Sequence, residues 1–181
     1  MQKYSFLLAG TVASLLFLGL GCNPGASISN KIGEKVAEGI INQSTGGKAS
    51  VDLGKDKMVF KDNKTGSSMA YGENLTIPDD FPKDVPVYPG ASVKGIVTSK
   101  EGGASYTLTL MSKDTNAKVI AWYQDKMKSD GWTEEASMSA TGYETRSYQK
   151  DSLSIGLNVI GGDEQDQDRE TSIMISRTEK K

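Results

Sequence analysis

The sequence predicts an α+β protein in which one antiparallel sheet packs against a single helix, in the order ββαββββ. Two observations lead to this prediction. Through residues 92–181, several segments carry apolar residues at every second position, which is typical of half-buried strands. One stretch among them repeats its apolar residues every three to four positions, as an amphipathic helix does. Because no strand–helix–strand unit recurs, we expect antiparallel pairing. An amphipathic helix and a small β-meander are expected to precede this domain.

Residues 1–21 have the pattern of a secretory targeting segment. Lys3 supplies a positive start, and an apolar run of suitable length extends from Phe6 to Leu20. The run ends just before Cys22, the only cysteine of the chain. We therefore expect removal of residues 1–21 and a flexible tether over residues 22–28. An uncleaved membrane helix and a secreted protein with a free thiol are the alternatives.

The stretch "LGLGC", which ends in Cys22, resembles the lipobox of bacterial lipoproteins. The resemblance implies cleavage before Cys22, a diacylglycerol on its sulfur and a third acyl chain on its amino group. Two or three acyl chains hold a protein on a membrane effectively permanently, since each buried methylene contributes about 0.8 kcal/mol. It also implies a place on the cell membrane or outer membrane, with the folded part facing the periplasm or the exterior.

Residues 29–43 are predicted to form the amphipathic helix. Apolar residues recur every four positions and form one stripe, which consists of Ile28, Ile32, Val36 and Ile40. Such stripes usually contact a core, so we expect this helix to lie on the chain's own domain. Docking on a partner protein is the alternative.

Residues 48–72 are predicted to form the small β-meander. Three short alternating runs are separated by "GKDK" and "DNKTG", which are rich in turn-forming residues. This segment has too little apolar surface to be stable alone, so it must dock or pair elsewhere.

Residues 73–91 hold four of the five prolines and are predicted to form an extended strap. Proline fixes the backbone, removes a hydrogen-bond donor and excludes helix. A connector within the chain is the preferred interpretation, and a proline-rich ligand for an aromatic groove is the alternative. The side chains expected to press the strap onto the core are Phe81, Val85, Val87 and Tyr88.

The main domain is predicted over residues 92–181. Two strands lead into a helix with Asp114 or Thr115 as its N-terminal cap. Its buried stripe is expected to consist of Val119, Ile120, Tyr123 and Met127. Gly131 should take the left-handed conformation just past the helix, so that Trp132 folds back onto Met127. Four further strands follow, with apolar faces at Leu153, Ile155, Leu157 and Val159, and at Ile173 and Ile175.

The stretch "DFPKDVPVYPGA", followed by two strands and the helix end "AWYQDKMKSDGW", resembles a group of bacterial lipoproteins. Members pair such a proline strap with a module of this strand and helix order. The likeness is strongest from about Leu75 to Trp132. Because no activity is assigned to the group, the resemblance implies only a location and module boundaries.

The composition excludes several classes of function. Histidine is absent, which removes the usual general base, the Ser-His-Asp and Cys-His arrangements, and the common zinc sites. The net charge of −2 argues against nucleic acid, which requires a basic face. We expect no cofactor.

Three sets of residues remain as candidates for chemistry or binding. Glu134, Glu135 and Glu144 lie on neighbouring predicted strands and are candidates for carboxylate-dependent glycoside hydrolysis, although a solvated sheet face explains them more simply. The acidic segment 161–170 offers oxygen ligands for Ca²⁺, but its spacing is not that of an EF-hand, and a solvated hairpin tip is preferred. The calcium candidates are Asp163, Glu164, Asp166 and Asp168. Trp122 is either a rim residue of the core or a hot spot for a partner.

Three functions follow in order of preference. The first is a non-enzymatic lipoprotein, anchored through Cys22, whose α+β module binds another component of the bacterial envelope, expected to be a protein. The second is a module that binds a small ligand or Ca²⁺. The third is a hydrolase that uses the carboxylates.

Overall fold

The computed structural model describes residues 35–36, 38–40, 42–43, 45–101, 103–161 and 170–179. Nine strands and the helix α2 (Asn116–Ser129) form most of this part of the chain. The strands are β1 (Ala49–Leu53), β2 (Lys57–Asp62), β3 (Ser68–Gly72), β4 (Ser92–Ser99), β5 (Ser105–Ser112), β6 (Thr133–Ala140), β7 (Tyr143–Lys150), β8 (Leu153–Ile160) and β9 (Thr171–Glu179).

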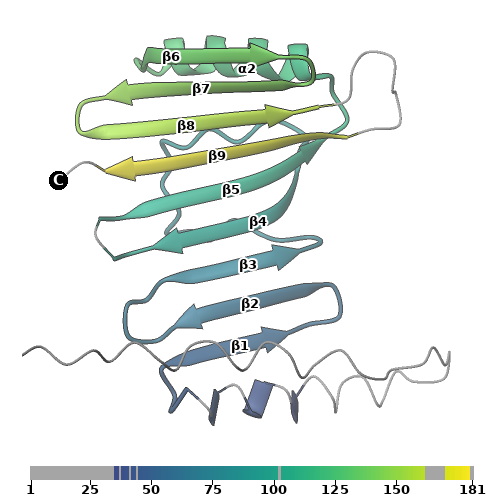
Figure 1. Cartoon of the computed structure of the whole chain (residues 1–181), viewed down its shortest axis with the longest axis vertical. Coiled ribbons are helices and arrows are strands. Elements are labelled where there is room, and N and C mark those ends of the chain that lie inside the picture. Colours follow the sequence, from purple (N-terminus) through teal and green to yellow (C-terminus); the bar gives the residue numbers. More distant parts are fainter. Residues whose placement is uncertain are drawn as a thin grey trace, which may run out of the picture.

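All nine strands belong to one antiparallel sheet, in the spatial order β1-β2-β3-β4-β5-β9-β8-β7-β6 (Figure 1). The expected antiparallel sheet with one packed helix is therefore present. The molecule is richer in sheet than an α+β fold with a separate meander, because β1–β3 continue the sheet of the main domain. The pairing of β3 with β4 explains this difference, since short strands that cannot bury a core of their own gain stability by pairing with an existing edge.

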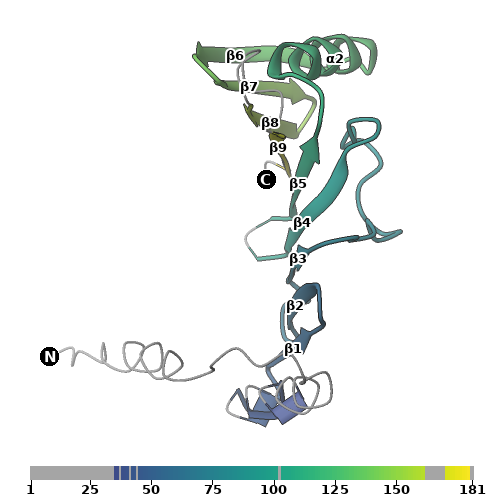
Figure 2. The same ribbon diagram turned by 90° about the vertical axis from the view of Figure 1, so that its right-hand side faces the viewer.

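One face of the sheet is covered by α2 and by the strap, which lie on the same side (Figure 2). The buried stripe of α2 consists of Val119, Ile120, Tyr123 and Met127, as its spacing predicted. The strap buries Phe81, Val85 and Tyr88 in the same core, whereas Val87, which was expected there too, is exposed. The strands supply inward residues such as Leu108, Leu157 and Ile175. This packing keeps much of one face of β4, β5, β7, β8 and β9 away from water, whereas every residue of β6 is exposed.

Both ends of α2 are formed by local hydrogen bonds. Of the two predicted caps, Thr115 is the one used, because its side chain accepts from the Lys118 N–H at 3.4 Å. At the other end Gly131 has φ +81°, and the Trp132 N–H donates to the Met127 carbonyl at 2.9 Å. The predicted fold-back of Trp132 over the helix end is thus confirmed as a Schellman motif.

The segment before β1 contacts the sheet through polar atoms. Within the range predicted as a helix, the described residues 35–36, 38–40 and 42–43 are helical. Val36 and Ile40 are exposed, whereas Glu38 is buried. The expected packing of the apolar stripe on the chain's own domain is therefore wrong for these two residues. The reason is that the outward N–H groups of β1 need hydrogen-bond acceptors. The Leu53 N–H donates to Glu38 Oε1 at 2.7 Å, so a polar side of the segment faces the sheet.

Candidate functional site

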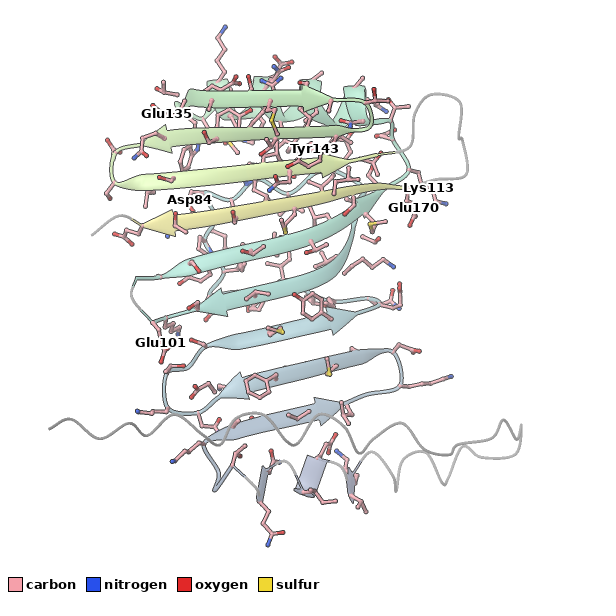
Figure 3. All side chains as sticks on the ribbon, in the orientation of Figure 1. Asp84, Glu101, Lys113, Glu135, Tyr143 and Glu170 are labelled. Atoms are coloured by element: carbon pink, nitrogen blue, oxygen red, sulfur yellow. The ribbon has the colours of Figure 1, made fainter. Side chains whose placement is uncertain are left out.

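The face of the sheet opposite α2 is the candidate site, and we call it the open face. In an antiparallel pair, directly opposed residues lie on the same face, and successive residues of a strand lie on opposite faces. The register therefore assigns every paired strand residue to one face or the other. In Figures 1 and 3, α2 lies behind the sheet, so the open face is turned toward the viewer.

Two ladders of opposed residues cross the whole open face from β1 to β6. The first consists of Val51, Phe60, Met69, Val97, Thr107, Ser176, Gly156, Ser147 and Ala136. The second consists of Leu53, Met58, Tyr71, Gly95, Thr109, Met174, Asn158, Thr145 and Met138. Neither ladder contains a charged residue.

Two shorter ladders flank them on β4–β9, and they are uncharged as well. They consist of Ser92, Met111, Ser172, Ile160, Tyr143 and Ala140, and of Ser99, Ser105, Thr178, Ser154, Gln149 and Thr133. Among register-paired residues of the described strands, Asp62 is the one charged group on this face. Its Oδ1 accepts from the turn N–H groups of Lys64 and Thr65, at 2.7 and 3.1 Å. The bulge residues Lys94 and Glu135 have no register partner.

Large apolar side chains are concentrated on this face. Four of them, Met58, Phe60, Met69 and Tyr71, form what we call the Met–aromatic patch on β2 and β3, with exposed fractions of 39–46%. Met138, Ile160 and Met174 lie on the same face toward the other edge and are also exposed. An exposed apolar area of this extent marks an interaction site more often than a free surface.

The sequence segregates charge to the opposite face of the same strands. In β2, Lys57 and Lys61 alternate with Met58 and Phe60. In β7, the charged residues are opposed to inward residues of β8, as Arg146 is to Leu157. The outward positions of β7 are instead Tyr143, labelled in Figure 3, with Thr145, Ser147 and Gln149. The alternation of apolar residues with Ser, Thr, Asn and Gly, rather than with Lys and Glu, is the sequence signal for this face.

The candidate carboxylates are divided by the structure. Glu134 and Glu144 come together on the covered side, because both accept from Arg146. Nη1 donates to Glu134 Oε2 at 2.8 Å, and Nε donates to Glu144 Oε1 at 2.7 Å. With its amide oxygen turned inward, Gln124 of α2 accepts from the same guanidinium at 2.9 and 3.0 Å. Glu135, labelled in Figure 3, occupies the bulge and is exposed. Ion pairs of Arg146 join β6 to β7, and the hydrogen bonds of Gln124 join α2 to them.

Trp122 packs at the border of the covered core. Its ring makes edge contacts with Tyr88 and Tyr123, with centroids 5.2 and 4.8 Å apart. The Tyr88 hydroxyl donates to Asp114 Oδ2 at 2.7 Å, and burial together with this bond raises the pKa of Tyr88 to about 12. Trp122 thus lies against the core on the side of the sheet away from the open face.

The remaining predicted sites lie outside the described residues. They are Cys22 and the calcium candidates Asp163, Glu164, Asp166 and Asp168. Among the residues with described positions, no cluster of three or more acidic or thiol side chains is arranged to hold a metal ion. No helix in the described ranges has both the length and the apolar character needed to cross a membrane.

Comparison with known families locates one module within the chain. Residues 91–176 match a family model described as START domain-like. The match spans β4 to β9 and α2, and it leaves out β1–β3. No curated protein and no solved structure matches the chain.

Proposed function

We propose that this protein is a lipoprotein anchored through Cys22 to a membrane of the bacterial envelope, and that it docks an envelope protein on its open face without catalysis. The observation that carries the docking proposal is the pair of uncharged ladders, with the exposed Met–aromatic patch at one end. Exposing such a face to water is unfavourable, and covering it releases that cost. The targeting pattern and the lipobox resemblance support the anchor.

Photo-crosslinking of the full chain in cells tests the docking proposal. A photoreactive amino acid at Phe60 faces outward from the open face, and the same group at Lys61 faces the other side of the same strand. We expect a discrete crosslinked protein from position 60 and none from position 61. Equal capture from both positions, or capture from neither, would reject the open face as the docking surface.

Acylation is tested separately by labelling cells with a palmitate analogue. The full chain should carry the label, and Cys22→Ala should abolish it and retain residues 1–21 on the protein. A labelled Cys22→Ala chain, or an unlabelled parent chain, would reject the anchor.

We also propose that residues 29–43 form one continuous amphipathic helix between anchor and sheet.

A second candidate is a module that binds a small ligand. The START domain-like match over residues 91–176 favours it, because it defines a unit of sheet and helix separate from β1–β3. A ligand specific to the native state must raise the unfolding temperature. The full chain is therefore screened with small ligands, with millimolar Ca²⁺ and with chelator. A raised unfolding temperature would support ligand binding, and an unchanged one under every condition would count against it. The hydrolase gains no support from the carboxylates, since Arg146 stands between Glu134 and Glu144.

A further inference from the structure

We propose that the protein docked on the open face is a second copy of this chain, so that two sheets stack face to face about a twofold axis along β5. The inference rests on the proposed function, because it names the occupant of the same face. Three properties of the face support it: the absence of charge from its two long ladders, the area, and the order of large and small residues along the ladders.

The absence of charge from the two long ladders makes the middle of the face complementary to itself. In a twofold interface each surface meets its own copy, so charges near the axis would oppose like charges. The two long ladders contain none, although the same strands carry Lys57, Lys61 and Arg146 on their other face. A partner with charged groups would call for complementary charges here, and an anionic lipid surface would call for Lys or Arg. The two long ladders have neither.

The area of the face is sufficient for a stable dimer. Strands of eight residues are about 27 Å long and neighbours lie about 4.8 Å apart, so β4–β9 span roughly 800 Å² and β1–β3 add roughly 250 Å². A standard specific interface buries about 800 Å² on each partner. A dimer that leaves the margin of the open face uncovered would therefore still bury the area of a standard interface on each copy.

The first ladder places large residues on β1–β4 and small residues on β9, β8, β7 and β6. Thr107 and Thr109 of β5 occupy the middle of the nine positions in the first and second ladder, respectively. With a twofold axis parallel to β5, each ladder residue of one copy faces a residue of the same ladder in the second copy. The two residues lie the same number of strands from β5, on opposite sides of it. Phe60 then faces Ser147 of the second copy, and Met69 faces Gly156.

In the second ladder two of the opposed pairs join a large and a small side chain, and at its ends Leu53 meets Met138 in an apolar contact. Gly95 faces Met174 of the second copy, and Met58 faces Thr145. Each of these pairs joins a large side chain to a small one, which is how two packed sheets interdigitate. An axis perpendicular to the strands and parallel to the sheet would instead oppose the Met–aromatic patch to itself and leave the small residues of the first ladder facing small residues.

Disulfide trapping in membranes from cells that express the full chain tests the axis. Thr109→Cys lies beside the proposed axis, so mild oxidation should link two copies through this position. Lys61→Cys is the matched control on the other face, and the parent chain gives the background from Cys22. We expect most of the Thr109→Cys chain at twice its mass, at least tenfold above both controls. Equal dimer from Lys61→Cys would mean random collision and overturn the inference.

A charge-pair rescue provides an independent test. Phe60→Glu should reduce copurification of two differently tagged copies at least tenfold, because it buries an unpaired charge opposite Ser147. The double variant Phe60→Glu, Ser147→Lys places opposite charges in contact at both symmetric positions and should restore it. Lys61→Glu should have no effect. Circular dichroism of each variant excludes misfolding as the cause.

The outcomes separate this inference from the proposed function. Crosslinking from position 60 to another protein, without the Thr109→Cys dimer, would overturn the second copy as the occupant and retain the docking face. No crosslink from position 60 together with no Thr109→Cys dimer would overturn both. A dimer from Thr109→Cys and a self-crosslink from position 60 would support both.

Discussion

Tyr71 and Gly95 are neighbours across β3 and β4, and the Tyr71 ring lies over the glycine on the open face. A Cβ added at Gly95 would lie 2.9 Å from Tyr71 Cε1 and 3.1 Å from Thr109 Cβ. We predict that Gly95→Ala destabilises the protein by about 1–2 kcal/mol, because the ring and Thr109 must both give way. Urea unfolding measures the difference.

A double-mutant cycle tests whether the Tyr71 ring causes the destabilisation by Gly95→Ala. In a Tyr71→Ala background, Gly95→Ala should cost less than in the parent chain, since only the Thr109 contact remains. Gly156→Ala combined with Tyr71→Ala is the control pair, and we expect additivity because these residues lie on β8 and β3. Additivity for Gly95 and Tyr71 as well would show that the ring does not press on the glycine.

The Tyr88 hydroxyl gives a pH dependence with a defined sign. Its pKa is about 12 in the folded chain and about 10 in an unfolded one, because burial and Asp114 favour the neutral form. Between these values the unfolded chain binds fewer protons, so the free energy of unfolding must fall as the pH rises from about 10 to 12. We predict that Tyr88→Phe makes this decline shallower. Identical slopes for both proteins in urea unfolding at pH 9, 10 and 11 would contradict the assignment.

At the scale of elements, the segment before β1 protects the edge of the sheet. β1 is the first strand of the sheet order, and an edge strand presents unpaired N–H groups. Glu38 Oε1 accepts from the Leu53 N–H, and Asn42 Oδ1 accepts from the Val51 N–H at 3.3 Å. Glu38 and Asn42 are four positions apart, so one side of a helix reaches alternate residues of the strand.

We predict that Glu38→Ala speeds hydrogen exchange at Leu53, and that Asn42→Ala does so at Val51. Each substitution should leave the amides of β5 unchanged. Lys35 and the Leu53 N–H lower the pKa of Glu38, so this protection is complete above the ordinary carboxyl pKa and is lost as the pH falls through the lowered value. Gln43→Ala, at an exposed helical position, is the control. Unaltered exchange at Leu53 in Glu38→Ala would reject the edge contact.

The elements also show where sequence reasoning succeeds. Helix α2 could be predicted with both ends, because Thr115, Gly131 and the buried stripe act within a few residues of one another. The segment before β1 could not be placed, because its pattern identifies an apolar side but not the N–H groups that Glu38 would reach. Val36 and Ile40 are therefore exposed where a core contact was expected.

At the scale of the molecule, the sheet order depends on contacts distant in sequence. The placement of β9 beside β5, and of β3 beside β4, joins segments whose pairing no local pattern specifies. For the same reason the open face was missed: its strands could be recognised, but the ladders exist only once nine strands are in register. In register, the outward Ser and Thr residues of the separate strands form one continuous surface. From the sequence alone, each strand would only be expected to have its own solvated face.

The core is unevenly distributed along this single sheet. Among apolar residues of β1–β3, Ala49 alone is buried, and Ala70 is the one that packs against the core. Strands β5, β8 and β9, in contrast, bury Leu108, Leu157 and Ile175 completely. Local opening free energy follows buried contacts, so β1–β3 should open without the rest of the sheet.

We predict that amides of β2 are protected from hydrogen exchange at least tenfold less than amides of β9. Stacking of a second copy would raise protection on β2, so the comparison is made in Phe60→Glu as well as in the parent chain. A larger difference between β2 and β9 in Phe60→Glu than in the parent chain would agree both with partial opening and with coverage of the Met–aromatic patch. Equal protection of β2 and β9 in both proteins would mean that pairing with β4 alone makes the nine strands one cooperative unit.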